Sequence, residues 1–388
     1  MSPAGPHPAP PAPDLILRAA RVIDPSQGID RVTDVAFASG RIAAVGDALA
    51  AGHATDVREL AGCIVTPGLI DLHTHVYWGG TSIGVDPVAL ARSSSAATLV
   101  DAGTAGPGNF PGFRRHVIEP SRPVRILPFL NLSFAGIFGF SATVMVGESA
   151  DLRLLDLGEC VRVIREHADL ILGVKVRVGR GASGASGIVP MEMALEVAEE
   201  TGLPLMAHLD HPPPSRLAVM SLLRPGDILT HCFRPFPNAP SMPGGGVRPE
   251  VLAARERGVI FDIGHGAGSC GFGTARAMLA AGFKPDVISS DVHVLSINGP
   301  AFDLLHTLAK FHVLGMSLTE VVACATVNAA RAIRRPELGT LALGAPGEAS
   351  VFQVLAEPTA YQDVRGEVIQ GPVRFAARGL VLEGRWWS

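Results

Sequence analysis

The chain has 388 residues, of which 47% are hydrophobic and 18% are charged, and its formal net charge is −4. This length accommodates a large α/β domain with a smaller companion, and the hydrophobic fraction can supply a sizeable core. The absence of a basic run in the sequence argues against a nucleic-acid partner. No uninterrupted apolar run reaches about 18 residues, so we expect no membrane span and no membrane partner.

The five cysteines are scattered, and none belongs to a Cys-x-x-Cys pair. This pattern favours reduced thiols and a cytoplasmic location over a disulfide scaffold. The first thirteen residues are mostly Pro, Ala, Gly and His, with no basic region before an apolar run. We therefore predict a disordered tail over residues 1–13 and no signal peptide.

Both ends of the chain contain short strand-like segments separated by turn residues. In the first part the candidates are 15–17, 22–23, 35–37 and 42–45, and in the last part they are 349–354, 373–378 and 380–382. Because these two regions flank one long α/β region, we predict a small discontinuous β-sandwich domain made of residues 14–64 and 336–388.

The region 65–335 alternates strand-like and helix-like segments without a strong break. The strand candidates are 69–75, 97–103, 125–132, 172–178, 203–209, 227–233, 259–264 and 286–292, and the clearest helices are 191–201 and 252–257. Eight such units in about 270 residues fit an α/β fold of the TIM-type (β/α)8 barrel class. A doubly wound open sheet is the alternative, but no Gly-rich phosphate fingerprint follows any of these strands. We predict a catalytic barrel with functional residues at the carboxyl ends of its strands.

The first strand of this region carries a candidate metal-binding motif. Residues 68–75 read Gly-Leu-Ile-Asp-Leu-His-Thr-His, and in a strand Asp71, His73 and His75 share one face. Two imidazoles at this spacing form a chelate for zinc or a similar divalent metal. Two hydrogen-bonded histidines at a strand end would give the same pattern. Asp71 lies deeper, and we predict that it supports the ligands.

Four later strands also end in, or contain, a polar side chain that would be costly to bury without a partner. These residues are Lys175, His208, His231 and Asp291. A metal site accounts for all of them together. We predict that His73, His75 and Asp291 hold the more buried of two metal ions and that His208 and His231 hold the other. Lys175 can bridge the two only after CO₂ has converted its amine into a carboxylate.

This arrangement predicts a hydrolytic mechanism. A water shared by two metal ions has its pKa lowered toward neutrality, so a metal-bridging hydroxide would be the nucleophile. Asp291, next to that water, would be the catalytic general base and acid, because it can take the proton and deliver it to the leaving group.

The chain resembles the amidohydrolase superfamily from about residue 14 to the C-terminus. The resemblance is carried by Thr66 to His75 and then by Lys175, His208, His231 and Asp291 in the family's order. It implies a binuclear centre, with Zn²⁺ as the expected metal, and the terminal β-sandwich. After Leu338 to Leu341 the family usually continues with Gly-x-x-Ala-Asp, whereas this chain has Gly347-Glu348-Ala349-Ser350.

Tyr77 and the stretches 173–177, 264–269 and 289–293 resemble a dihydroorotase-like or deacetylase-like branch of that superfamily. The resemblance implies a deacylase of small acyl amides or esters, such as N-acyl amino acids or O-acyl hydroxy acids. Substrates of this branch often carry a carboxylate beside a D- or R-configured centre. We also expect a homo-oligomer.

Five residues are candidates for substrate binding: Arg177, Tyr77, His265, Asn131 and His293. Arg177 shares the face of Lys175, and its guanidinium suits a substrate carboxylate. An ion pair with a nearby acidic residue is the alternative for Arg177, and packing or hydrogen bonding within the fold is the alternative for the others. The Gly-rich loop 179–187 is either a lid over the site or a solvated loop.

Two rival functions stay open at this point. A cyclic amidase would open a dihydroorotate-like or hydantoin-like ring with the same residues, and product analysis would separate ring opening from deacylation. A non-catalytic scaffold, as found among relatives that have lost metal ligands, would contain no metal.

Overall fold

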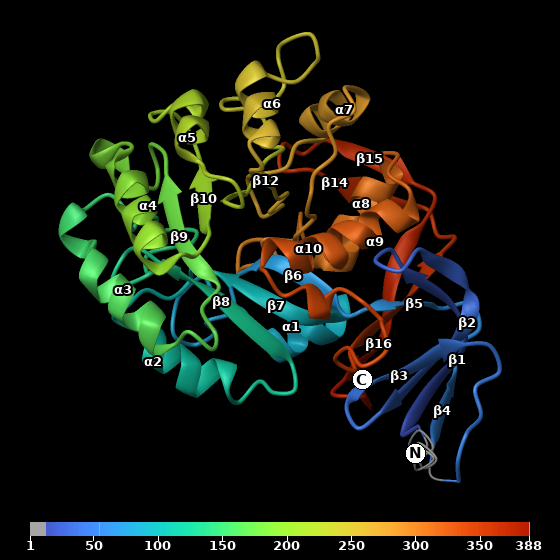
Figure 1. Ribbon diagram of the computed structural model, residues 1–388. Helices are drawn as coiled ribbons and strands as arrows, with labels where there is room; N and C mark the ends of the chain where they lie inside the picture. Colours follow the sequence, from blue (N-terminus) through green and yellow to red (C-terminus); the bar gives the residue numbers. More distant parts are fainter. Residues whose placement is uncertain (1–12, 54, 388) are drawn as a thin grey trace, which may run out of the picture.

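The computed structural model describes residues 13–53 and 55–387, so all but Pro13 of the predicted tail lies outside the described residues. A curled α/β region occupies one side of the molecule and a β-rich region the other (Figure 1). Within the described ranges, no helix combines the length and the apolar character that crossing a membrane requires.

The described residues of the two chain ends form one eight-stranded sheet in the order β17-β16-β13-β5-β1-β2-β3, with β4 paired to β1. The first part of the chain supplies β1 (Leu15–Asp24), β2 (Ile29–Ala38), β3 (Arg41–Gly46), β4 (Asp56–Glu59) and β5 (Ile64–Pro67). The last part supplies β13 (Ala349–Leu355), β16 (Arg374–Leu382) and β17 (Arg385–Trp387). The two ends meet where β13 runs antiparallel to β5. A second layer, as a sandwich needs, stays a prediction.

Two details of the terminal strands differ from the sequence prediction. Segments 15–17 and 22–23 belong to one strand, β1, whose register shifts between Leu17 and Ala20. Ala19 has a φ of +57° at this point, so a bulge interrupts the pattern without ending the strand. Segments 373–378 and 380–382 likewise fall in one strand, β16, except for Val373, which precedes it. A separate hairpin pairs β14 (Thr359–Gln362) with β15 (Val368–Gly371).

The middle of the chain forms a curled sheet, of which the described residues make seven parallel strands in the order β12-β11-β10-β9-β8-β7-β6 (Figure 1). The strands are β6 (Leu69–Thr74), β7 (Ala96–Ala102), β8 (Arg125–Asn131), β9 (Gly173–Val178), β10 (Leu205–Leu209), β11 (Ile228–Leu229) and β12 (Ile260–Phe261). Each coincides with a predicted strand, although β11 and β12 are much shorter than expected. A curled half-barrel is thus present.

Segment 286–292, expected as the eighth strand, is not a regular strand. It makes one isolated parallel bridge from Val287 to Asp262 and another from Val292 to Thr74. The nitrogen of Asp291 also donates to the carbonyl of His73 at 2.7 Å. Because Asp291 has a φ of +48°, it cannot continue an extended ladder. The segment therefore lies beside both β12 and β6 without forming a continuous strand.

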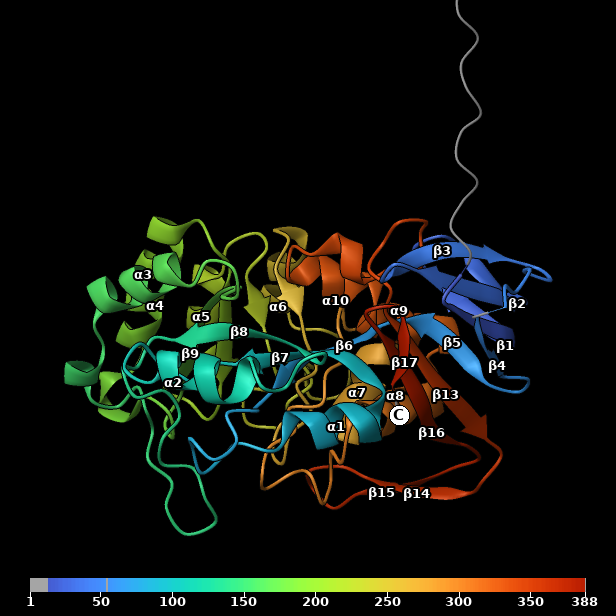
Figure 2. The same cartoon turned by 90° about the horizontal axis from the view of Figure 1, so that it is seen from below.

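The helices surround the parallel sheet (Figure 1). They are α1 (Pro87–Ser94), α2 (Phe110–Phe113), α3 (Leu157–Glu166), α4 (Val189–Thr201), α5 (Arg216–Leu222), α6 (Pro249–Glu256), α7 (Phe272–Ala280), α8 (Leu304–Val313), α9 (Leu318–Ala325) and α10 (Val327–Ala332). A π-helical turn (Arg114–Ile118) follows α2, and short 3₁₀ turns occupy Leu152–Leu154, Gly184–Ser186 and Pro336–Leu338. Seen from below, α3 and α4 lie at the end of the molecule opposite the terminal sheet (Figure 2). The predicted helices 191–201 and 252–257 correspond to α4 and α6.

Strands β6 to β10 are covered on both faces. All of their residues are buried except Arg125 and Arg177, which are partly exposed. Apolar side chains fill most positions, as expected of parallel strands that contact helices and core on opposite sides. A charged or imidazole side chain in such a strand must therefore find a buried partner or line a cavity.

Candidate metal centre

A small cavity of about 40 Å³ lies where the parallel strands end. Its lining residues are His73, His75, Ile83, Ile137, Phe140, Lys175, Arg177, His208, His231, Asp291 and His293. The structure thus brings together all of the residues that the sequence suggested as metal ligands, although they come from different strands and from segment 286–292.

Three of these residues form a compact cluster. The Nε2 atoms of His73 and His75 each lie 3.3 Å from Oδ1 of Asp291. One donor atom from each of the three residues lies within 4.8 Å of the other two. The rings of His231 and His73 are 5.1 Å apart, and those of His231 and His208 are 4.5 Å apart. The rings of His231 and His208 therefore extend the row of imidazoles from this cluster across the cavity.

The far side of the His73 ring is fixed by a hydrogen-bond chain. The hydroxyl of Thr230 donates to Asp262 at 2.7 Å, and His73 Nδ1 lies 2.8 Å from the same hydroxyl oxygen. Ser289 donates a second hydrogen bond to Asp262. Because the Thr230 proton is used toward Asp262, the Nδ1–H of His73 must donate to the hydroxyl. This leaves the Nε2 lone pair of His73 facing the cavity, as a metal ligand requires.

His75 and His231 are oriented in the same way. His75 Nδ1 lies 2.8 Å from the hydroxyl of Thr104, which donates to Asp101 at 2.7 Å. His231 Nδ1 lies 2.7 Å from the carbonyl oxygen of Gly264. Burial lowers the pKa of His231 well below its ordinary value and that of His75 to about 3. Both rings are therefore neutral at physiological pH, with Nε2 available.

Two buried nitrogen atoms at the cavity have no hydrogen-bond partner among residues 13–53 and 55–387: Lys175 Nζ and His208 Nε2. Lys175 is completely buried, and burial lowers its pKa to about 7. Leaving such groups unpaired costs about 1–3 kcal/mol each, and more when they are charged. A group bound in the cavity would remove this cost, so the donor set fits a divalent metal centre.

The backbone around the site is held in uncommon conformations. His231 has a φ of +64° and Asp291 a φ of +48°, in the left-handed region that non-glycine residues rarely adopt. Each such residue costs on the order of 1–3 kcal/mol and is typical of functional sites. Gly264 also has a positive φ, and a Cβ there would lie 2.3 Å from the Thr230 hydroxyl and 2.8 Å from His231 Nδ1. The Gly-rich turn after β12 therefore lets the backbone approach the ligands closely.

Of the predicted substrate-binding residues, Arg177 and His293 line the cavity. Arg177 Nη1 donates to Glu148 Oε2 at 3.1 Å, and its guanidinium carbon lies 5.5 Å from the centre of the Phe140 ring. The ring of His293 contacts Phe140 edge-on at 5.2 Å. The alternative interpretation of Arg177, an ion pair with an acidic neighbour, is thus realised, although the side chain still borders the cavity.

The structure does not bring the other three to the cavity. The ring of Tyr77 stacks on Phe113 at 4.7 Å. The amide of Asn131 bonds to nearby backbone groups through both its nitrogen and its oxygen. His265 Nε2 lies 2.9 Å from Nζ of the buried Lys310. Each of these side chains contacts a partner within the fold. The sequence alone does not reveal these partners.

A larger outer cavity of about 240 Å³ adjoins the first and shares Phe140, Arg177, His208, Asp291 and His293 with it. Its other lining residues are Met145, Val146, Gly147, Gly181, Asp210, Arg234, Ala267, Gly268 and Ser269. Arg234 is not among the residues that the sequence suggested, although a charged residue three positions after His231 and directly after the buried Cys232 and Phe233 is a usable signal.

The Gly-rich loop 179–187 borders the outer cavity and is tied to the end of β10. The backbone nitrogens of Gly181 and Ala182 donate to Asp210 at 3.3 and 3.0 Å. Gly179 has a φ of +134°, and a Cβ there would lie 1.9 Å from Asp210 Oδ1. Close approach of this carboxylate therefore requires glycine at position 179.

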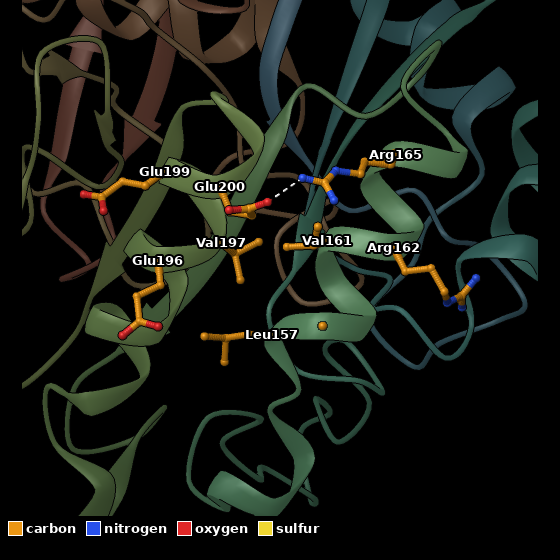
Figure 3. Close-up of a pocket in the computed structure, with 9 residues that line it drawn as sticks. Leu157, Val161, Arg162, Arg165, Glu196, Val197, Glu199 and Glu200 are labelled. Atoms are coloured by element: carbon orange, nitrogen blue, oxygen red, sulfur yellow. Dashed lines mark hydrogen bonds and ion pairs between the residues drawn. The ribbon is translucent and has the colours of Figure 1, made fainter.

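A groove of about 990 Å³, much more voluminous than either cavity, lies elsewhere, between α3 and α4 (Figure 3). Its lining residues are Leu157, Gly158, Val161, Arg162, Arg165, Glu196, Val197, Glu199 and Glu200. Arg165 pairs with Glu200, and both side chains are about 60% exposed. Solvated charges of this kind need no ligand, so the groove offers no chemistry comparable to that of the small cavity.

Comparison with known proteins adds to this geometry. No protein-family model matches the chain. A deacetylase of Agrobacterium fabrum is 36% identical over 343 residues, which cover 88% of this chain and 83% of that protein. A solved structure of a dihydroorotase is 34% identical, has a TM-score of 0.87, and is matched over 96% of this chain and 97% of the other. A solved adenine deaminase is 27% identical, with a TM-score of 0.89 and coverages of 97% and 99%.

Proposed function

Since this chain belongs to the amidohydrolase superfamily and is a hydrolase of amide bonds, we propose that it is a binuclear deacylase of small N-acyl amino acids or O-acyl hydroxy acids. The similarity to a deacetylase over most of both chains supports acyl-group removal. Preference for a D- or R-configured centre is part of the proposal and rests on the sequence motifs of the branch.

One observation carries the proposal. Lys175 Nζ and His208 Nε2 are buried and unpartnered within the described residues, and both residues line the cavity that holds the cluster of His73, His75 and Asp291. Buried nitrogens without partners are rare in folded proteins, and a metal centre is a common explanation for them.

The donor set divides into two halves. His73, His75 and Asp291 would hold one metal ion, His208 and His231 would hold the second, and Lys175, as its CO₂-derived carboxylate, would lie between them. Burial keeps much of the Lys175 amine neutral near pH 7, because its pKa is lowered to about 7, and only a neutral amine attacks CO₂. Zinc ions, when bound, would polarise the acyl carbonyl and supply a water-derived nucleophile at neutral pH.

The protein's own residues then handle the proton and the substrate. Burial raises the pKa of Asp291 to about 6, so its carboxylate can take a proton and return it to the leaving nitrogen or oxygen near neutral pH. Arg177, paired with Glu148, borders the cavity, and Phe140 and Ile137 give the cavity an apolar wall. His293 completes the wall beside Asp291. No direct substrate role is assigned to Tyr77, Asn131 or His265 in this scheme.

The architecture belongs to the same proposal. Residues 65–335 would form the catalytic (β/α)8 barrel, which segment 286–292 would close through its bridges to Asp262 and Thr74. Residues 14–64 and 336–388 would form the β-sandwich domain. A cytoplasmic location rests on the cysteine pattern of the sequence, and a homo-oligomer on its resemblance to the superfamily.

The test is hydrolysis of a panel of N-acyl-D- and N-acyl-L-amino acids, O-acyl hydroxy acids and cyclic imides by purified protein, with product analysis. Deacylation releases two products from one substrate, and we expect this result. Ring opening alone would identify a cyclic amidase, the second candidate, which the similarity to a dihydroorotase favours. Absence of turnover on the whole panel would contradict both.

A further inference from the structure

We propose that Arg234, rather than Arg177, binds the substrate carboxylate, and that it selects acyl substrates carrying an anionic group near the scissile bond. The inference rests on the proposed deacylase function and names the specificity-determining contact of the same site. Arg234 lines the outer cavity, where it shares a wall with Ser269.

The guanidinium of Arg234 is incompletely paired. Its Nη2 donates to the hydroxyl of Ser269 at 3.0 Å. Its Nε is buried and has no hydrogen-bond partner in the described part of the chain. In the same ranges, no carboxylate forms an ion pair with it. The side chain as a whole is partly exposed at the cavity wall, but its desolvation still lowers the pKa of Arg234 to about 10. A partly desolvated cation is stabilised by a counter-ion.

The acidic groups near Arg234 are engaged elsewhere. Asp210 faces the outer cavity, but its two carboxylate oxygens accept hydrogen bonds from the backbone of Gly181 and Ala182. Asp291 lies in the His73 and His75 cluster. An external carboxylate is therefore the group that Arg234 lacks, and the fork geometry of a guanidinium suits it.

Arg177 makes an instructive contrast. Its charge is already balanced, because Nη1 donates to the fully buried Glu148 at 3.1 Å. Its guanidinium carbon lies over the Phe140 ring. Binding a substrate carboxylate there would place a second anion beside Glu148. Arg177 is therefore better suited to shaping the wall between the two cavities.

The position of Arg234 fixes where the carboxylate would lie. Its backbone nitrogen donates to the carbonyl of His231 at 3.0 Å, so the arginine is tied to a predicted metal ligand. Because the inner and outer cavities share His208 and Asp291, an acyl carbonyl in the inner cavity leaves the remainder of the substrate in the outer one. There the carboxylate would meet Arg234, and the side chain would contact Met145 and Val146.

The experiment compares Arg234→Gln and Arg234→Lys with Arg180→Gln, an exposed arginine in the neighbouring loop. Each variant is assayed on an N-acetyl amino acid and on its carboxamide, which lacks the negative charge. A charge-assisted hydrogen bond contributes about 1.5–3 kcal/mol, so we expect Arg234→Gln to raise KM for the acid about 10- to 100-fold. For the carboxamide we expect less than about a twofold change, with partial rescue by Arg234→Lys and none of these effects in Arg180→Gln.

Equal losses on the acid and the carboxamide would overturn the proposal, because they would indicate a purely structural role. Calorimetric binding of the free amino acid gives a readout that does not depend on turnover, and thermal melting confirms folding. If no acyl substrate is turned over but Arg234→Gln abolishes amino-acid binding, the deacylase assignment fails and the subsite stands. If acyl acids are turned over and Arg234→Gln leaves their KM unchanged, the deacylase assignment stands and the subsite is wrong.

Discussion

The cavity at the strand ends and the groove between α3 and α4 differ in size and in chemistry. The groove is about 990 Å³ and the inner cavity about 40 Å³. In the groove, charges such as those of Arg165 and Glu200 are solvated and paired. In the cavity, Lys175 Nζ and His208 Nε2 are buried without a partner in the described ranges. The functional site is therefore marked by two unpaired buried donors that share one cavity with the His73, His75 and Asp291 cluster, and not by open space.

The largest expected effect comes from Lys175→Ala, which removes the proposed bridge. We expect turnover to be abolished and metal content to fall, as measured by assay and elemental analysis. The matched control is Lys284→Ala, because Lys284 is half exposed and paired with Glu320 on the surface. Unaltered turnover in Lys175→Ala would contradict the bridging role. It would also mean that the unpaired Lys175 does not distinguish the cavity from the α3–α4 groove in function.

Asp291→Asn keeps the size of the side chain but removes the proton acceptor. General acid–base catalysis contributes about 10²–10⁴-fold, so we expect kcat to fall within that range. Asp169→Asn is the control, since Asp169 is exposed and paired with Arg114. A kcat of Asp291→Asn within about threefold of the native value would contradict the proton-transfer role.

Thr230→Val breaks the hydrogen-bond chain from His73 to Asp262. Loss of such supporting contacts weakens metal affinity about 10- to 100-fold, which a chelator competition would measure. Thr98→Val is the matched control in β7, because the hydroxyl of Thr98 is buried and has no partner within the described residues. Equal metal affinities of the two variants would show that the hydrogen bonds from His73 through Thr230 to Asp262 do not orient His73 as a metal ligand.

The pH dependence of reconstitution tests Lys175 directly. Burial lowers the pKa of its amine to about 7, so the neutral form that attacks CO₂ increases as the pH rises through 7. We expect metal-stripped protein, incubated with zinc under the same partial pressure of CO₂ at both pH values, to regain activity about tenfold faster at pH 8 than at pH 6. Omission of CO₂ is the control. Faster recovery at pH 6 would have the wrong sign for carboxylation of this amine.

The smallest expected effect is that of Arg165→Ala in the α3–α4 groove. An exposed ion pair contributes at most about 1 kcal/mol, so we expect a similarly small change in the free energy of unfolding, measured by denaturant titration. Turnover should stay within about twofold of native. A large loss of activity would mean that the groove, and not only the cavity, takes part in function.

The site could be assembled from sequence to the extent that polar residues interrupt apolar strands. His73, His75 and Lys175 lie within or directly after buried strands, where parallel topology brings strand ends together. Asp291 was found by the same argument, although its segment is irregular. The φ of +48° at Asp291 interrupts the hydrogen bonding of an extended strand. The residue pattern of the sequence does not predict this backbone conformation.

The surroundings of several candidate residues depend on partners that are distant in the sequence. His265 is bound by Lys310, 45 positions later, and therefore does not reach the cavity. Glu148 neutralises Arg177 from a loop that has no regular periodicity. The position of Arg234 after buried residues can be read in the sequence, but its lack of a counter-ion can be seen only in three dimensions. The sequence identifies which polar residues are costly to bury. Only the fold shows which of them have a hydrogen-bond or ion-pair partner.

The most direct test of the central claim is the metal stoichiometry of freshly purified protein, measured by elemental analysis. The donor set of His73, His75, Lys175, His208, His231 and Asp291 predicts about two divalent ions per chain. A content near zero, in protein that melts cooperatively, would contradict the metal centre and leave the buried nitrogens of Lys175 and His208 without an explanation.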